Sequence, residues 1–428
     1  MDTIFAQATA QGRAGVCVIR ISGAHAFEIA EKIAHPLPPV RHAAVRPIVG
    51  LDGGTIDNAL VLVFQGPSSF TGEDVVELHL HGSIAVVKAV LTLLSTFPDT
   101  RLAEPGEFTR RAMENGKLDL TQVEGLGDLI EAETEAQRKQ ALRVLSGHLG
   151  QRVDDWREKL IRAAALLEVT IDFADEDVPV DVSGEVGELL ASVNNDILNE
   201  LKGFHTAERI RTGFEVAIIG RPNAGKSTLL NALAGRDAAI TSSVAGTTRD
   251  VIEVRMDIGG LPVTLLDTAG LREGADEVEA IGIDRAMTRA AQADLRVFLV
   301  EEGEELPVLA EPEDIRLLPK ADLRDDPAGA VSGTTGQGLS DLIAQIQSVL
   351  EKRSLTAGLA THERHRNALQ KAADGLEFSM SILDHGPDQY DIAAEELRHS
   401  IRALEALVGR IDVENLLDVI FSSFCLGK

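Results

Sequence analysis

The feature that most constrains the fold of this 428-residue chain is a glycine-containing octapeptide between an apolar run and an apolar helical pattern. Residues 220–227 read G-R-P-N-A-G-K-S and match the pattern G-x-x-x-x-G-K-[ST]. Glycines in such a loop let backbone N–H groups turn toward phosphate oxygens, and the following helix presents the positive end of its dipole. We expect Lys226 to reach the β- and γ-phosphates and Ser227 to bind Mg²⁺. The octapeptide therefore predicts a nucleotide-binding α/β domain.

Two segments downstream carry the residues that switch loops need. Residues 245–250 read A-G-T-T-R-D, and Thr248 is expected to complete the Mg²⁺ shell when the γ-phosphate is present. Asp267 ends an apolar run, so its carboxylate is expected to hold a Mg²⁺-bound water, and the N–H of Gly270 to sense the γ-phosphate. Either segment alone would be interpreted as a turn. Their order after the phosphate-binding loop favours the switch interpretation.

Residues 319–322, P-K-A-D, occupy the place of an N-K-x-D base-reading motif. Asp322 could accept two hydrogen bonds from guanine N1 and N2, which adenine cannot supply, and Lys320 could lie along the base. Pro319 lacks the bracing amide of asparagine, so weaker binding with retained guanine preference is expected. The predicted contacts to GTP or GDP are Asn223, Ala224, Gly225, Lys226, Ser227, Thr228, Ser242, Ser243, Val244, Ala245, Gly246, Thr247, Thr248, Asp267, Thr268, Ala269, Gly270, Pro319, Lys320, Ala321, Asp322, Ser332, Gly333 and Thr334.

Four segments that differ in their strand and helix signals predict a multidomain chain of α/β and α structure. Residues 1–117 form an α+β domain, with strands expected at 15–21, 59–64 and 75–80 and helices at 84–96 and 107–115. Residues 118–208 and 354–428 are helical. Between them, residues 209–353 alternate strands and helices, with strands at 215–220, 251–258, 262–267, 295–300, 315–318 and 330–332. The pattern predicts one helical domain interrupted by an inserted Ras-like doubly wound domain.

Apolar residues at helical spacing mark the faces that the long helices are expected to bury. Three such stripes stand out: Val153, Trp156, Leu160, Ala163 and Leu167; Leu189, Val193, Ile197 and Leu201; and Leu397, Ile401, Leu404 and Val408.

The formal net charge of −27 argues against a protein that coats nucleic acid by bulk electrostatics, so any RNA contact would use a local patch or a partner. Arg110-Arg111 and Arg138-Lys139 are candidate patches, although solvated helix faces are the favoured interpretation. No apolar run is long enough for a membrane span and no signal peptide is visible, so a cytoplasmic protein without membrane contact is expected.

Several motifs along the chain resemble those of one family. They are D-T-I at residues 2–4, R-I-S-G at 20–23, S-F-T-G-E-D at 69–74, E-P-G-E-F-T at 104–109 and C-L-G-K at 425–428. Together with the phosphate-binding loop, they are similar to the tRNA modification GTPases called MnmE or TrmE, nearly from end to end. The loop alone identifies only a very large superfamily, whereas the combination is specific.

The resemblance implies that the N-terminal domain forms a homodimer and binds 5-formyl-tetrahydrofolate or a related folate. By motif position Arg20, Glu77 and Lys117 would contact the folate, with Lys428 nearby. The residues alone favour solvated surface charges for Arg20 and Lys117. His79 and His81 lie on one strand face and are assigned to structure or to the wall of the folate site rather than to a metal site.

The resemblance also implies roles in hydrolysis. Asn223 would bind K⁺ beside the phosphates, and Ser242, Val244 and Thr247 would complete the K⁺ shell when two nucleotide-binding domains meet. Glu279 would orient the attacking water, although the residues alone favour a solvated acidic run. Cys425, expected at the end of an apolar helix over 416–424, is either a buried thiol or a residue with a role in activity; both remain open.

The function implied by the resemblance is a K⁺-dependent GTPase. In a heterotetramer with an FAD-dependent partner of the MnmG type, it would add an aminomethyl or carboxymethylaminomethyl group to carbon 5 of wobble uridine 34 in certain tRNAs. A switch GTPase of ribosome assembly, of the Era-like kind, is the principal alternative. A folate-dependent aminomethyltransferase with a regulatory nucleotide-binding domain is the third.

Overall fold

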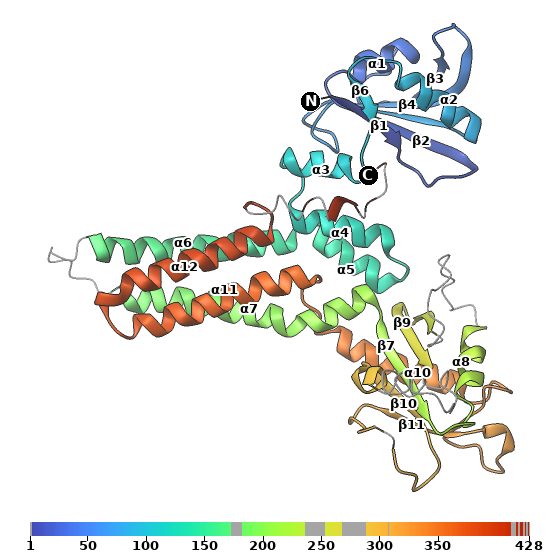
Figure 1. Cartoon of the computed structure of the whole chain (residues 1–428), viewed down its shortest axis with the longest axis vertical. Helices are drawn as coiled ribbons and strands as arrows, with labels where there is room; N and C mark the ends of the chain where they lie inside the picture. Colours follow the sequence, from blue (N-terminus) through green and yellow to red (C-terminus); the bar gives the residue numbers. More distant parts are fainter. Residues whose placement is uncertain are drawn as a thin grey trace, which may run out of the picture. The chain divides into compact units, whose positions relative to one another are not determined.

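The computed structural model of the chain describes residues 2–172, 182–235, 253–267, 288–306, 308–411, 417, 420–422, 424 and 427. The chain divides into two compact units. Residues Met1–Gly127 and Glu405–Lys428 form the first, and Asp128–Leu404 form the second. Each unit contains one six-stranded sheet (Figure 1).

The sheet of the first unit has the strand order β3-β4-β5-β2-β1-β6. All neighbouring strands are antiparallel except β1 and β6. Its elements are β1 (Thr3–Gln7), β2 (Ala14–Ser22), α1 (Ala26–Ile33), β3 (Ala44–Val49), β4 (Thr55–Phe64), β5 (Val75–Gly82), α2 (Ile84–Leu94), β6 (Thr100–Leu102), α3 (Glu107–Glu114) and α4 (Leu120–Glu131). The five elements predicted for the N-terminal α+β domain are confirmed, and the structure adds α1, β1, β3 and β6.

The two faces of this sheet differ because side chains alternate along each strand. Ile19, Ile21 and Leu78 point to the face covered by α1 and α2 and lie in the main core of this unit. Arg20 and Glu77 therefore point to the opposite face, and they are direct cross-strand partners between β2 and β5. On that second face Phe108 of α3 closes a smaller core with Ile4, Ala6 and Ala103.

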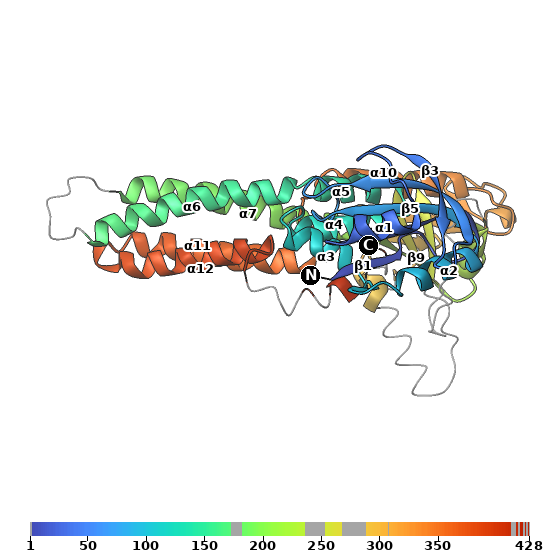
Figure 2. The same ribbon diagram turned by 90° about the horizontal axis from the view of Figure 1, so that it is seen from above.

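Long helices of the second unit lie side by side in both views of the ribbon (Figures 1 and 2). Outside the inserted domain, the described helical elements of this unit are α5 (Glu135–Leu145), α6 (His148–Asp172), α7 (Ser183–Thr212), α11 (Glu363–Leu383) and α12 (Tyr390–Leu407), with a 3-10 turn at Pro387–Gln389. The predicted stripe on α6 is confirmed, since all five of its residues are buried. On α7 the prediction was wrong for Leu189 and Leu201, which are only partly buried. The buried positions there include Leu190 and the charged Glu200.

The inserted domain is a doubly wound sheet with the order β12-β11-β10-β7-β9-β8. Only β8 is antiparallel to its neighbour. Its elements are β7 (Phe214–Gly220), α8 (Lys226–Ala234), β8 (Glu253–Ile258), β9 (Leu261–Asp267), β10 (Leu295–Leu299), β11 (Ile315–Pro319), the 3-10 turn Ala321–Leu323, β12 (Ala330–Val331) and α10 (Leu339–Ser354). The predicted fold class is confirmed, and the six predicted strands all form.

The two connections of the inserted domain to the long helices are held together. Gly203 of α7 accepts a backbone hydrogen bond from Gly358 (3.2 Å), and the buried carboxylate of Glu200 accepts one from the amide of Leu359 (2.7 Å). Arg211, near the end of α7, donates to the carbonyl of Thr361 just before α11 (3.0 Å). Closely placed ends are what allow a domain to be inserted into another.

Candidate functional site

The predicted nucleotide contacts gather at one edge of the doubly wound sheet. Parallel strands β7, β9, β11 and β12 place their carboxyl ends at the same edge, which is where open α/β sheets bind ligands. The phosphate-binding loop follows β7, and Asp267 is the last residue of β9. Lys320 and Asp322 follow β11, and Ser332 follows β12. The sheet thereby brings together segments more than 100 residues apart in the sequence.

The phosphate-binding loop has the backbone that its residue types favour. Asn223 and Gly225 have positive φ angles of 61° and 95°, which asparagine and glycine adopt more readily than other residues. Gly220 lies so close to β10 that a Cβ there would be 2.6 Å from the carbonyl oxygen of Leu299. The loop therefore requires glycine at this position.

Lys226 and Ser227 are held by atoms of the site itself. Lys226 Nζ donates to the carbonyls of Gly220 (2.7 Å) and Arg221 (2.9 Å), so the ammonium spans the loop. Burial lowers the pKa of Lys226, and the carboxylate of Asp267 acts in the opposite direction. Ser227 Oγ donates to Asp267 Oδ2 at 2.7 Å. The site therefore offers a hydroxyl and a carboxylate oxygen close together. Mg²⁺ prefers oxygen atoms of this kind, which it binds directly or through a water molecule.

Of the predicted base-reading segments, the loop at Ser332 and Gly333 meets the first turn of α8. Lys320 adopts a left-handed conformation (φ 58°) and begins the 3-10 turn that contains Asp322. Ser332 Oγ accepts hydrogen bonds from the amides of Thr334 and Thr335, each at 3.2 Å. A Cβ on Gly333 would lie 2.5 Å from the carbonyl carbon of Thr228, so this loop packs directly on the start of α8. The loop that begins at Ser332 therefore lies against the helix that follows the phosphate-binding loop.

Several predicted site residues lie outside the described residues. They are Ser242, Ser243, Val244, Ala245, Gly246, Thr247, Thr248, Thr268, Ala269, Gly270, Glu279, Cys425 and Lys428. Their roles remain predictions.

A second candidate site lies on the N-terminal sheet. Arg20 donates from Nε (3.0 Å) and Nη2 (2.9 Å) to the single oxygen Oε1 of Glu77. The guanidinium carbon of Arg20 lies 5.2 Å from the ring centre of Phe70 and 5.6 Å from that of Phe108. The interpretation of Arg20 as a solvated charge was therefore wrong, because its charge is paired and held against two aromatic rings. Lys117 is exposed, and its Cε lies near Gly72 of the same loop as Phe70.

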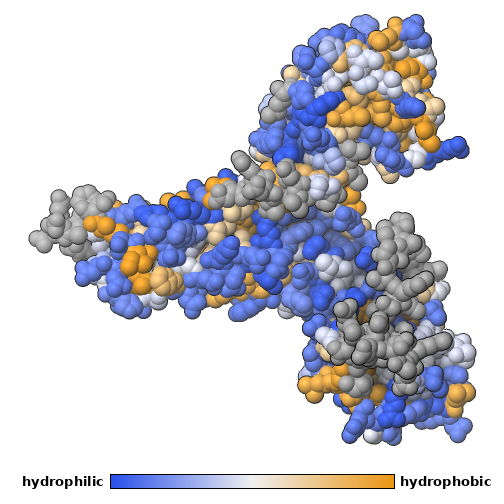
Figure 3. Space-filling view, viewed as in Figure 1, coloured by the Kyte–Doolittle hydropathy of each residue, from blue (hydrophilic) through white to orange (hydrophobic). Residues whose placement is uncertain are grey.

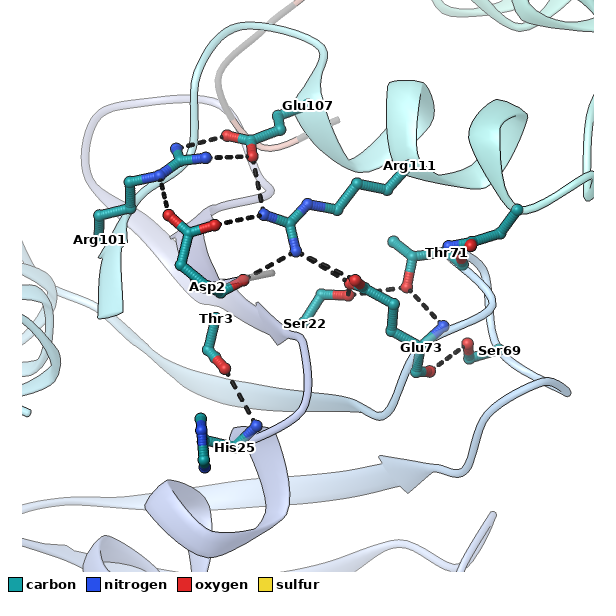
Figure 4. Close-up of polar contacts among 11 residues, drawn as sticks. Asp2, Thr3, Ser22, His25, Ser69, Thr71, Glu73, Arg101, Glu107 and Arg111 are labelled. Atoms are coloured by element: carbon teal, nitrogen blue, oxygen red, sulfur yellow. Dashed lines mark hydrogen bonds and ion pairs between the residues drawn. The ribbon is translucent and has the colours of Figure 1, made fainter. Parts of the chain in front are cut away.

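A buried cluster of charges, shown in Figure 4, supports the loop that carries Phe70. Arg111 is the central residue of this cluster, with 5% of its side chain exposed. It donates to Glu107 Oε1 (2.9 Å), Glu73 Oε1 (3.1 Å) and the carbonyl of Asp2 (3.0 Å). Glu73 in turn accepts a hydrogen bond from Ser22 (2.7 Å). The solvated interpretation of the Arg110-Arg111 pair was wrong for Arg111, because its side chain is buried and paired with carboxylates.

Ionisation within this cluster is biased toward the charged forms. Burial would raise the pKa of Glu107, but hydrogen bonds from Arg101 and the Glu104 amide, together with Arg111, bring it below its usual range. The Arg101 hydrogen bond likewise lowers the pKa of Asp2. The cluster is therefore a set of mutually stabilised ions.

The end of the chain reaches this domain. Phe421 packs against Gly106 in the E-P-G-E-F-T segment, and a Cβ on that glycine would lie 2.8 Å from the phenyl ring. Gly427 lies against the backbone of Gln7 and Ala8, at the end of β1. Gln7 pairs with Ile19, the neighbour of Arg20. The described part of the C-terminal motif thus lies at the end of β1, the strand next to the one that carries Arg20.

The doubly wound sheet, the phosphate-binding loop, the Ser227–Asp267 pair and the base-reading segments define a P-loop GTPase domain. A family model described as "MnmE helical domain" matches residues 120–425, and one described as "GTP-binding protein TrmE N-terminus" matches residues 3–117. Proteins called "tRNA modification GTPase MnmE" from Roseobacter denitrificans and Ruegeria pomeroyi are 65% and 64% identical over 428 residues, which is all of both chains. The chain therefore belongs to the MnmE family.

A solved structure of Aquifex aeolicus Era bound to GDP.AlF4- is 22% identical, with a TM-score of 0.24, over 38% of this chain and 66% of that one. None of the helices in the described ranges is long and apolar enough to cross a membrane.

Proposed function

We propose that this chain is a K⁺-dependent GTPase that modifies carbon 5 of wobble uridine 34 in certain tRNAs. The observation that carries the proposal is the nucleotide site at the carboxyl edge of the doubly wound sheet, in a chain matched over its whole length by relatives called tRNA modification GTPases. We assign the four segments 1–117, 118–208, 209–353 and 354–428 to the folate-binding domain, the helical domain, the inserted GTPase domain and the rest of the helical domain. The activity would take place in the cytoplasm.

The residues of the inserted domain would carry GTP hydrolysis. Lys226, which binds two loop carbonyls in the free loop, would exchange them for phosphate oxygens. Ser227 would bind Mg²⁺, Asp267 would hold a Mg²⁺-bound water, and Thr248 would complete the shell. Asn223, exposed at the tip of the loop, would bind K⁺ together with Ser242, Val244 and Thr247. These cations would neutralise charge that develops on the phosphates. Glu279 would position the attacking water.

The N-terminal sheet would bind the one-carbon donor. Glu77, held by Arg20, would present its second carboxylate oxygen to the polar edge of 5-formyl-tetrahydrofolate, while Arg20 and Lys117 would favour the anionic tail. Lys428 and Cys425 would lie near this site, which the placement of Gly427 beside β1 supports. The folate would supply the carbon atom that is transferred to uridine.

The assembly that we propose is a homodimer joined to an FAD-dependent MnmG-type protein in a heterotetramer, with tRNA as the substrate. Apolar side chains gather on a visible face of the N-terminal domain in Figure 3. Val45 and Leu60, which face each other between β3 and β4, are 63% and 37% exposed. Exposed apolar pairs on a sheet are suited to a protein interface, and they support dimerisation through this domain.

The test is nucleoside analysis of tRNA from a bacterial strain that lacks its own member of the family. Expression of the chain should restore the modified wobble uridine, whereas Lys226→Ala, which removes the phosphate-binding ammonium, should not. Full restoration by Lys226→Ala would separate the GTPase site from modification. Failure of the wild-type chain, when it is folded and co-expressed with its own MnmG-type partner, would contradict the proposal.

A further inference from the structure

One polar atom of the N-terminal site has no hydrogen-bond partner. His79 Nε2 is buried and forms no hydrogen bond with any residue in the described part of the chain. It lies 3.5 Å from Glu77 Oε2, without the geometry of a hydrogen bond. Burying a polar atom without a hydrogen-bond partner costs on the order of 1–3 kcal/mol, so such atoms are rare in folded proteins and are often linked to function.

The position of His79 is set by the sheet. It points to the same face as Glu77 because the two residues are separated by one position on β5. Its cross-strand neighbours are Val18 on β2 and Leu60 on β4, neither of which has a polar side chain. The ring is thus flanked by apolar residues, and its side chain is 27% exposed. A ligand that contacts Glu77 on this face of the sheet would also lie against the exposed part of the His79 ring.

His81 provides the contrast on the same strand face. Its Nδ1 is 2.7 Å from Asp57 Oδ1, its amide donates to Asp57 Oδ2 (2.8 Å), and its side chain is 74% exposed. Nδ1 and the amide of His81 are therefore engaged within the domain. Of these two histidines, His79 is the one with a buried ring nitrogen in need of a partner.

The two oxygens of Glu77 are used unequally. Arg20 directs both of its hydrogen bonds to Oε1, which leaves Oε2 facing His79. A carboxylate oxygen at this distance repels the lone pair of an unprotonated ring nitrogen, so it favours the His79 tautomer with hydrogen on Nε2. The site then presents an acceptor, Glu77 Oε2, beside a donor, His79 Nε2–H.

We propose that His79 is a ligand-contacting residue that, together with Glu77, recognises an N–H group adjacent to a carbonyl. The inference rests on the proposed folate function and names the feature of the ligand that is recognised. The lactam edge of a 4-oxopteridine carries such an N–H and C=O pair. Glu77 Oε2 accepts the hydrogen bond from the ring N–H, and His79 Nε2 donates to the 4-oxo group. A 4-amino group in place of the 4-oxo group would turn its own N–H donors toward the N–H donor of His79, so no hydrogen bond could form.

Calorimetry on the full-length chain tests the proposal with three ligands. These are 5-formyl-tetrahydrofolate and the matched pair folic acid and aminopterin, which differ in the oxo or amino group at carbon 4. His79→Phe keeps the ring volume and removes the donor, and His81→Phe is the matched control on the same strand. Sites built to hydrogen-bond a substrate group discriminate strongly against analogues that lack it. We expect His79→Phe to weaken 5-formyl-tetrahydrofolate binding by at least about tenfold.

The preference for folic acid over aminopterin should also disappear in His79→Phe, while His81→Phe should retain both the affinity and the preference. The melting temperature and GTP hydrolysis of each variant report whether it has folded. Binding of 5-formyl-tetrahydrofolate to His79→Phe with wild-type affinity would overturn the inference and leave the folate site standing. A wild-type chain that binds aminopterin as tightly as folic acid would overturn it without any variant. If the wild-type chain binds no 5-formyl-tetrahydrofolate, the folate proposal itself fails.

Discussion

Replacing Arg111 by methionine should destabilise the N-terminal domain far more than the same change at Arg110, the preceding residue of the same helix. Arg111 is the cation that joins Glu73 to Glu107, and both of these side chains are at least 85% buried. Methionine keeps much of the apolar stem and removes the charge and its hydrogen bonds. The change therefore tests the ion cluster more than the packing.

The expected loss of unfolding free energy depends on which partners each carboxylate would keep after the substitution. Glu107 would keep its contacts with Arg101 and with the Glu104 amide. Glu73 would keep the hydroxyl of Ser22 but would lose its cation partner in the described part of the chain. Removing one partner of a buried ion pair costs about 3–5 kcal/mol, and partial solvation of Glu73 places the expected loss near the lower end, about 3 kcal/mol. Arg110 is more exposed, with 32% of its side chain accessible, and its ion pair with Glu114 at 3.5 Å lies at the surface, so its loss should cost less than that of Arg111.

Hydrogen exchange measured by mass spectrometry suits this prediction, because it resolves the free energy of opening for peptides of β1, β2 and α3. Trp156 lies in the second unit, so its fluorescence provides an internal control that should not change. Adding Glu73→Gln to Arg111→Met should recover part of the loss, since no buried charge would then lack its partner. If Arg111→Met and Arg110→Met destabilised these peptides equally, the reasoning about the buried cluster would be refuted.

Three further predictions concern single residues. The pKa of Glu107 is lowered in the folded state, so the ionised carboxylate stabilises the fold above the usual pKa of 4.5, and this stabilisation is lost as the pH falls through the folded-state pKa. Glu107→Gln should therefore weaken the acid sensitivity of the N-terminal domain below about pH 4.5 in titrations followed by circular dichroism. An unchanged titration would contradict this. Pro319→Asn should tighten GDP binding in calorimetry, by about tenfold if the new amide adds one hydrogen bond to a buried brace, and unchanged affinity would refute the role assigned to this position. Glu279→Ala should abolish GTP turnover and leave nucleotide binding intact, whereas near-normal turnover would remove the role of the glutamate.

The sequence predicted the inserted domain well because its signals are local. Each strand is a short apolar run, and the order of phosphate loop, Asp267 and the base-reading segment places their side chains at one sheet edge without knowledge of the contacts. The strand β6 was missed because it has only three residues, and β3 was missed because it contains Pro47, which disfavours a strand assignment.

The charged residues could not be predicted in the same way. Arg111 reads as one of two arginines on a polar helix, and only the fold brings Asp2 and Glu73 to it. Glu200 similarly occupies a buried position on α7 because the amide of Leu359, 159 residues later, needs an acceptor. This long-range contact is also why the stripe predicted on α7 was misplaced. For His79 the sequence showed the shared strand face, but the absence of a partner for Nε2 required the neighbouring strands.

The most direct test of the central claim is steady-state GTP hydrolysis by the purified chain in KCl and in NaCl at matched ionic strength. The proposed site predicts strong stimulation by K⁺ that is lost in Asn223→Ala, because the cation would bind at the tip of the phosphate loop. Equal rates in the two salts would contradict K⁺-assisted hydrolysis, and would favour a switch GTPase that depends on a separate activator.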